Sequence, residues 1–176
     1  MTMLPNSHRI PLETAHRLLA TFGITEPTKA YERWIKDDGF DFQDFPAVLA
    51  DSPYIFVVDW RAALEDELAL IAQGLAKLDA VLEHQIEPET SRGTVTCDAQ
   101  TRPVKFVPSD GDDFTAVIFA LQSIVPRRIE FRASPLNGEM DQWEFAVLPS
   151  DEWAELEALD PELVRSLFVP LADERT

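Results

Sequence analysis

The same strand-to-helix junction occurs twice in this chain, and this recurrence restricts the possible folds more than any other feature. "FVPSDGDDF" (residues 106–114) and "VLPSDEWAEL" (147–156) each place a proline, a serine and acidic residues after a strand-like run. Serine is a preferred helix N-cap, and acids are favoured in the first helical turn. We therefore predict that Ser109 and Ser150 cap two helices, with Ser109 and Asp112 at the spacing of a capping box.

A cation-binding loop is the alternative interpretation of the first junction, because it contains three aspartates and a glycine. If Asp110 is aligned with the first position of an EF-hand loop, the later ligand positions do not fit. Phe114, Thr115 and Leu121 then stand where a ligand, the glycine and the bidentate glutamate are needed. The sequence therefore favours a helix start here and predicts no metal site.

Two strand-like runs precede each junction, which predicts two units of a β-hairpin followed by a helix, at residues 93–125 and 127–159. In the first hairpin we expect strands at 93–99 and 103–108, linked around 100–102. In the second, an odd-numbered loop centred on Gly138 predicts the pairs Phe131–Phe145, Ile129–Val147 and Arg132–Glu144, which keep core residues on one face.

An apolar run, "YIFVV" (54–58), predicts a buried strand upstream of these units, and Asp59 can cap the long amphipathic helix that follows, up to residue 78. Gly74 is a mild flaw in that helix. "AVLEHQI" (80–86) fits either a strand or the end of the helix. The predicted fold class is α+β, with a mostly antiparallel sheet built from two β-hairpin-then-helix units plus an N-terminal strand–helix. Helices are expected on one face of that sheet.

The domain organisation follows from the same pattern. Residues 1–53 form a helical, loop-rich N-terminal segment that we expect to pack on an α+β domain at 54–176, and the two together are expected to form one globular domain. The start of the chain has no uninterrupted apolar stretch, no run is long enough for a membrane helix, and there is a single cysteine. We therefore expect a cytoplasmic protein that does not bind a membrane.

Acidic residues dominate the charge balance, with 32 Asp and Glu against 15 Lys and Arg and a formal net charge of -17. The excess is spread over both halves of the chain. Such a field repels nucleic acid and speeds encounters with cationic partners. Solubility alone, as bacterial proteins often achieve it through surface carboxylates, is the simpler explanation. A basic protein is the partner that this charge would suit.

Catalytic signatures are weak throughout the sequence. His8, His16 and His84 lie far apart and show no metal-ligand spacing, and Cys97 sits in an alternating strand where a buried, inert thiol is expected. No Walker loop, dinucleotide fingerprint or nucleophile elbow is present. The sequence predicts no catalytic residues, no metal and no cofactor, and it favours a protein that is not an enzyme.

One short stretch alternates aromatic and acidic residues, between positions 37 and 45. Aromatic anchors inside an acidic rim suit docking on a basic, partly apolar surface, whereas the alternative is a loop that its phenylalanines pin to the core. The candidate partner-binding residues are Trp34, Asp37, Asp38, Phe40, Asp41, Phe42 and Asp44. The basic residues Arg127, Arg128 and Arg132 are interpreted as part of a solvated sheet face with cross-strand ion pairs, since Glu130 shares that face.

These observations favour a small acidic protein that binds another protein, possible roles being an inhibitor or an immunity-type antidote that covers a cationic partner. Two alternatives stay open. One is an enzyme whose pocket gathers carboxylates that are distant in sequence, and the other is a domain that senses a small ligand.

Overall fold

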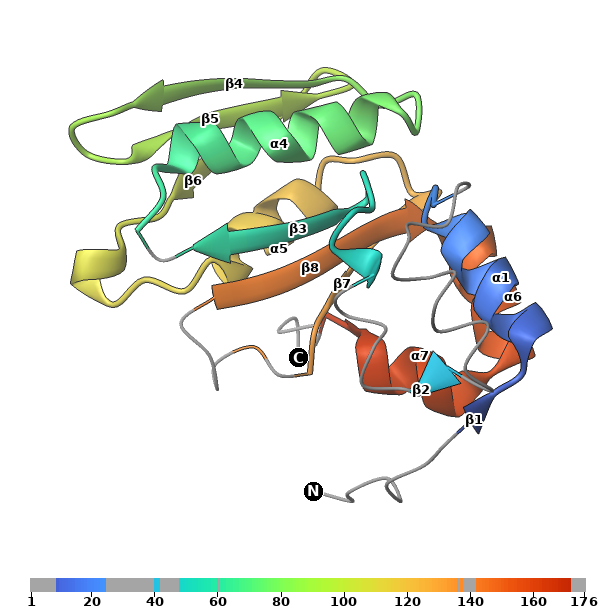
Figure 1. Cartoon of the computed structure of the whole chain (residues 1–176). Helices are drawn as coiled ribbons and strands as arrows, with labels where there is room; N and C mark the ends of the chain where they lie inside the picture. Colours follow the sequence, from blue (N-terminus) through green and yellow to red (C-terminus); the bar gives the residue numbers. More distant parts are fainter. Residues whose placement is uncertain are drawn as a thin grey trace.

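The computed structural model describes residues 9–24, 40–41, 48–59, 61–135, 137 and 142–171. Figure 1 traces the elements in chain order: β1 (Arg9–Ile10), α1 (Leu12–Thr21), β2 (Phe40–Asp41), β3 (Ile55–Asp59), α4 (Leu64–Ala76), β4 (Leu82–Glu87), β5 (Arg92–Cys97), β6 (Gln100–Lys105), η2 (Pro108–Asp110), α5 (Thr115–Gln122), β7 (Ile129–Ala133), β8 (Gln142–Pro149), α6 (Ser150–Leu159), α7 (Pro161–Leu167) and β9 (Val169–Pro170).

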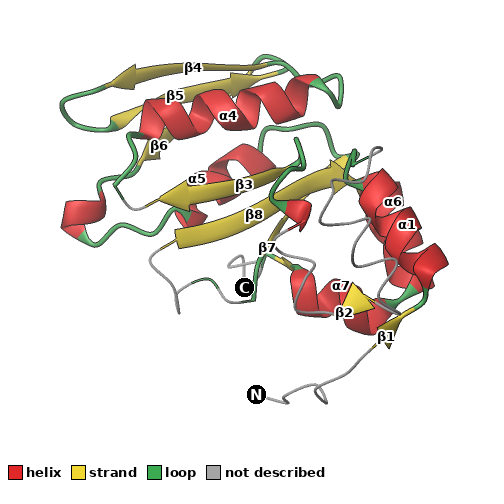
Figure 2. Cartoon of the chain, viewed as in Figure 1, coloured by secondary structure: helices red, strands yellow, loops and turns green. Residues whose placement is uncertain are grey.

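Antiparallel pairing joins the described strands into three sheets. The central sheet has the order β3-β8-β7-β9, a three-stranded sheet has the order β4-β5-β6, and β1 pairs with β2. Helices and strands alternate along the chain, and Figure 2 shows the helices packed against the sheets. The predicted α+β class is confirmed, as are the two hairpin-then-helix units, β5–β6–α5 and β7–β8–α6.

Helices cover both faces of the central sheet, in contrast to the predicted packing on one face. Phe56 and Val58 of β3 belong to a core that includes α4, α5 and the three-stranded sheet. Ile55, the neighbour of Phe56, belongs to a second core with α1, α6 and α7. Since successive side chains of a strand point to opposite faces, a sheet buried on both faces needs two covering layers. In Figure 1, α4 lies between the three-stranded sheet and β3.

The ambiguous run at 80–86 contributes a strand, β4, which pairs with β5.

The turn between β5 and β6 is shorter than expected and consists of Asp98 and Ala99, with φ angles of 47° and 65°. Two successive left-handed residues are the signature of a type I′ hairpin turn. A side chain at Gly93 would clash, because a Cβ there would lie 1.9 Å from the carbonyl oxygen of Gln85 on β4.

The second hairpin is shifted by two residues from the predicted register. Phe131 pairs with Val147, Ile129 with Pro149 and Arg132 with Ala146, so the predicted pairs are wrong although each residue keeps its face. In the observed register, the side chain of Asn137 bonds both backbone groups of Glu144. Its side-chain amide donates to the Glu144 carbonyl at 2.9 Å, and its side-chain oxygen accepts from the Glu144 N–H at 2.7 Å.

The helix starts also differ from the predicted caps. Ser109 lies within η2, and the side chain that accepts a hydrogen bond at the start of α5 is Asp113, from the Thr115 N–H at 2.8 Å. Ser150 is the first residue of α6 and makes no capping bond. Asp112 accepts a hydrogen bond from the Val107 N–H at 3.0 Å, so its carboxylate stabilises the turn between β6 and α5. In the part of the chain that the structure describes, no three His, Cys, Asp or Glu residues gather to hold a metal ion.

Candidate partner-binding groove

The partner-binding residues predicted from the sequence fall largely outside the described residues. Only Phe40 and Asp41 are described, as the backbone of β2, where Phe40 pairs with Ile10 and Asp41 with Arg9. The other five lie outside the described ranges: Trp34, Asp37, Asp38, Phe42 and Asp44. Their role in binding stays a prediction.

Strand β3 is an edge strand of the central sheet, because β8 is its only neighbour in the strand order of the described chain. The Val147 N–H donates to the Tyr54 carbonyl at 2.9 Å. Along an antiparallel strand, the backbone N–H and C=O groups of successive residues point alternately toward and away from the paired strand. Those of Phe56 and Val58 therefore point toward β8, as those of Tyr54 do. Ile55, Val57 and Asp59 therefore turn theirs toward the open edge.

Some of these outward groups have partners within the chain. The Ile55 N–H donates to the Ser52 carbonyl at 3.4 Å, and the Asp59 carbonyl accepts from the Ala62 N–H at 2.9 Å. The N–H and C=O of Val57 and the C=O of Ile55 have no hydrogen bond with any described residue. The open edge thus offers one donor and two acceptors around Val57.

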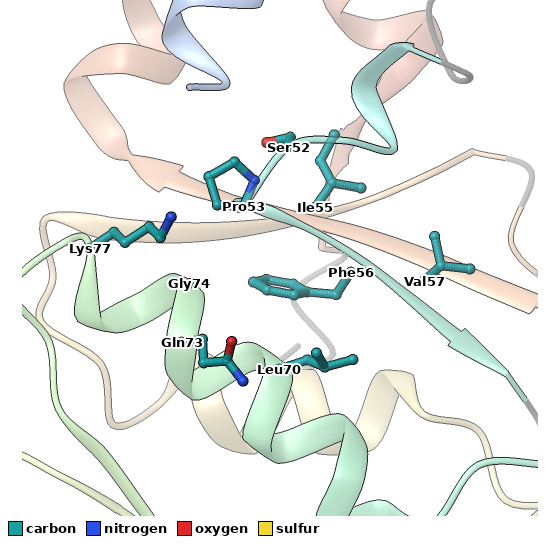
Figure 3. A pocket seen from close by; sticks show the side chains of 9 residues that line it. All are labelled: Ser52, Pro53, Ile55, Phe56, Val57, Leu70, Gln73, Gly74 and Lys77. Atoms are coloured by element: carbon teal, nitrogen blue, oxygen red, sulfur yellow. The ribbon is translucent and has the colours of Figure 1, made fainter. Parts of the chain in front are cut away.

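A groove of about 210 Å³ runs between this edge and α4. Figure 3 shows the nine residues that line it: Ser52, Pro53, Ile55, Phe56, Val57, Leu70, Gln73, Gly74 and Lys77. Val57 is 41% exposed and Leu70 50% exposed, so each element presents one large apolar side chain to solvent. The sequence predicted a buried strand here, and the exposure of Val57 corrects that expectation at this position.

Gly74 sets the close approach of α4 to β3, and in Figure 3 the ring of Phe56 points from β3 toward it. A Cβ at position 74 would lie 2.7 Å from Cζ of Phe56 and 2.7 Å from the carbonyl oxygen of Pro53. The glycine that weakened the helix prediction was therefore the one local signal of this contact. A glycine inside a helix often marks such a close contact.

Glu67 of α4 is buried near the end of β3, with only 5% of the residue exposed. Its Oε2 has no hydrogen-bond partner among the described residues. Burial raises the pKa of Glu67, and the charges of Asp59 and Asp66 raise it further, whereas a backbone hydrogen bond from Asp59 opposes the shift. The carboxyl group of Glu67 thus accepts a hydrogen bond from the backbone N–H of Asp59. The unpaired backbone groups of the edge are therefore limited to the region of Val57.

Asp59 itself makes a local turn and does not cap α4, which begins at Leu64 with Ala63 before it. Its Oδ1 accepts from the Arg61 N–H at 2.9 Å, and its Oδ2 accepts from the Arg61 guanidinium at 2.8 Å. The hydrogen bonds from Arg61 hold the pKa of Asp59 far below its usual range. The carboxylate therefore stays charged beside the groove at any ordinary pH.

Two of the basic residues at 127–132, Arg128 and Arg132, have structural partners that the sequence did not predict. Arg128 donates to the carbonyl of Leu78 at 2.6 Å, just beyond the C-terminal end of α4. Arg132 is buried, and its ion pairs are with Glu130 at 2.8 Å and with Glu157 of α6 at 2.6 Å. The expected solvated face with cross-strand pairs is therefore corrected for Arg132, because α6 covers it.

Cys97 is buried at the end of β5, and burial raises the pKa of its thiol.

No family model, curated protein or solved structure matches the chain. Within the described ranges, no helix is both long enough and apolar enough to cross a membrane.

Proposed function

We propose that this protein binds other proteins and that it takes up an extended, positively charged segment of its partner along β3. The observation that carries this proposal is the open edge at Val57, whose N–H and C=O both face away from β8. Unpaired backbone groups on an edge strand are a template for an added strand, and this mode of recognition is common among peptide-binding domains.

The groove supports an extended segment because it provides apolar contacts on both sides of the edge. A strand added beside β3 would place alternate side chains toward α4, where Leu70 is exposed, and toward the opposite face, where Val57 is exposed. Backbone hydrogen bonds would supply affinity, and these apolar positions would select alternate apolar side chains.

Charge supports a basic segment. The chain has a formal net charge of -17, and Glu144 lies directly opposite Val57 on β8, on the same face of the sheet. Asp59 follows on that face. A second copy of this acidic chain would be repelled, whereas Lys and Arg side chains would be attracted and would associate faster. An inhibitor or antidote of a cationic protein is one form that such a binding protein could take.

The test is selection of binding peptides from a displayed library of random decapeptides. We expect the selected sequences to alternate apolar residues with Lys or Arg and to bind more weakly as salt rises. In hydrogen exchange of the wild-type protein, a bound peptide should protect the Val57 amide. Peptides that bind without protecting this amide would overturn the proposal, and so would a selection that yields no binders.

A matched pair of variants at one position isolates the backbone contribution. Val57→Pro removes the outward N–H without breaking a hydrogen bond to β8, and proline is tolerated on an edge strand in that orientation. Val57→Thr keeps the N–H and a similar shape. We expect peptide affinity to fall at least tenfold in V57P, because one hydrogen bond contributes about 1.4 kcal/mol and this energy corresponds to a tenfold change in Kd. The affinity should change little in V57T. Equal losses in both variants would assign binding to the side chain and would contradict strand addition.

The predicted aromatic and acidic segment is tested separately with the double variant Asp41→Asn and Phe42→Ser. If the segment contributes to docking, the affinity for a selected basic peptide should fall while the stability of the fold is maintained. Unchanged peptide binding with lower stability would show that the segment only packs on the core.

A further inference from the structure

We propose that the protein also binds a small zwitterionic molecule, of the size of an amino acid or a dipeptide, in a polar pocket at the end of α5. The pocket has a volume of about 550 Å³ and lies between the β5–β6 turn and the segment that follows α5. Its lining consists of Asp98, Gln100 and residues 122–127. None of these residues lines the groove beside β3, so this site is independent of the proposed protein binding.

One part of the lining is electronegative. Pro126 has no N–H and cannot donate to the Gln122 carbonyl, four residues before it. The carbonyls of Gln122 and Ser123 accept no hydrogen bond from any residue of the described ranges. They form the C-terminal end of α5, where the helix dipole favours a cation. The carboxylate of Asp98 adds a full negative charge, so this part of the pocket suits an ammonium group.

Arg127 supplies the opposite charge. Its side chain is exposed and has no ion pair or hydrogen bond with the described residues, although its backbone carbonyl accepts a hydrogen bond from Ser150 at 3.4 Å. A guanidinium presents several donors in a planar array that matches a carboxylate. Among the described residues neither Asp98 nor Arg127 has an ion pair, so the lining presents one carboxylate and one guanidinium to a ligand.

Two other polar side chains of the lining, Gln122 and Ser123, are already engaged in hydrogen bonds. The amide of Gln122 donates to the Ile129 carbonyl at 3.0 Å and accepts from the Phe131 N–H at 2.6 Å. The hydroxyl of Ser123 donates to the Ala120 carbonyl at 2.7 Å. These bonds hold the end of α5 in place, and the tight turn at Asp98 fixes the other side.

Complementarity to both charges selects the class of ligand. A simple amine would leave Arg127 unpaired, and a simple carboxylate would leave Asp98 unpaired. A molecule that carries both an ammonium and a carboxylate group pairs with Asp98 and Arg127 at once, and these polar contacts fix its orientation.

The test uses free amino acids and dipeptides as probes, with ethylamine and acetate as single-charge controls, in thermal unfolding and calorimetric titration. We expect at least one zwitterion to bind saturably and to raise Tm by roughly 3–6 °C at ten times its Kd. Ethylamine and acetate should each bind at least tenfold more weakly. Equal binding of ethylamine would overturn the zwitterion assignment, and no shift with any probe would overturn the site.

Two variants test the walls of the pocket. Asp98→Asn keeps the left-handed turn, because asparagine tolerates positive φ, and Arg127→Gln removes the cation. Each should lower affinity at least tenfold for the zwitterion that binds. The matched controls are Asp79→Asn, at another exposed aspartate with a positive φ of 56°, and Arg102→Gln, at an exposed arginine of β6 outside the pocket. Unchanged binding in both pocket variants, or equal losses in the controls, would contradict the proposed site.

Discussion

The guanidinium of Arg132 on β7 lies 4.4 Å from the ring centroid of Trp153 on α6. The indole N–H of Trp153 donates to the Glu130 carbonyl at 3.0 Å, so the same ring also contacts the strand backbone. Glu130 and Glu157 pair with the guanidinium from either side. A cation over an aromatic face is stabilised most when it is desolvated, as it is here with 5% of the Arg132 side chain exposed.

Replacing Arg132 with Leu should destabilise the fold by about 2 kcal/mol, because the cation–aromatic contact and two ion pairs are lost together. The two glutamates are 32% and 39% exposed and can be hydrated, which keeps the loss below that of a fully buried charge. Urea unfolding measures the difference. Arg17→Leu is the control, because the Arg17–Glu155 pair is exposed and should contribute less than about 1 kcal/mol. Equal losses would contradict the role assigned to Arg132.

Gly74→Ala should destabilise the protein by about 1–3 kcal/mol, because the added methyl overpacks against Phe56 and the Pro53 carbonyl. Helix propensity alone predicts the opposite sign, a gain of about 1 kcal/mol for alanine over glycine. The sign of the change in unfolding free energy therefore decides between the two. A stabilised G74A variant would show that α4 does not approach β3 as closely as described.

Glu67→Gln should stabilise the protein at neutral pH. Burial raises the pKa of Glu67 in the folded state above its unfolded value. The folded state then binds the proton more tightly, so ionisation of this group lowers stability as pH rises from the unfolded pKa through the folded pKa. The advantage of the glutamine variant should therefore be largest at pH 7 and should vanish below the ordinary pKa of glutamate.

Chemical unfolding of both proteins at several pH values measures this difference and cancels the contributions of other groups, including Glu144, whose pKa burial also raises. Glu65→Gln, at an exposed position in the same helical turn, is the control. A variant less stable than the wild type at pH 7 would show that the charged form of Glu67 is the stabilising one.

Ala99→Gly should stabilise the β5–β6 hairpin by about 0.5–1 kcal/mol. Ala99 adopts a φ of 65°, where a side chain is strained and glycine is not. The greater entropy of glycine in the unfolded chain offsets part of this gain. Thermal unfolding measures the sum. The same substitution at Ala133, the last residue of β7, which pairs with Phe145 of β8 and Val169 of β9, should destabilise the protein and provides the control for a general effect of glycine.

Sequence patterns predicted which helices and strands form more accurately than the residues at which they begin and end. Alternation and β-branched runs located β3, β7 and β8, and Asp160 with Pro161 marks the start of α7, where Asp160 accepts from the Leu163 N–H at 3.0 Å. The predicted caps at Ser109 and Ser150 were wrong, because Asp113 accepts the hydrogen bond at the start of α5 and α6 begins at Ser150 without a side-chain cap.

The sequence by itself determined the α+β class, the two hairpin-then-helix units and the acidic surface, because periodicity, turn residues and charge are local properties. Tertiary structure alone decided the register of the second hairpin, since a shift by two residues leaves every side chain on its face. It also decided that β3 lies at an edge and that Glu67 is buried beside it. Which strand remains unpaired depends on contacts between distant segments, and no local pattern encodes those contacts.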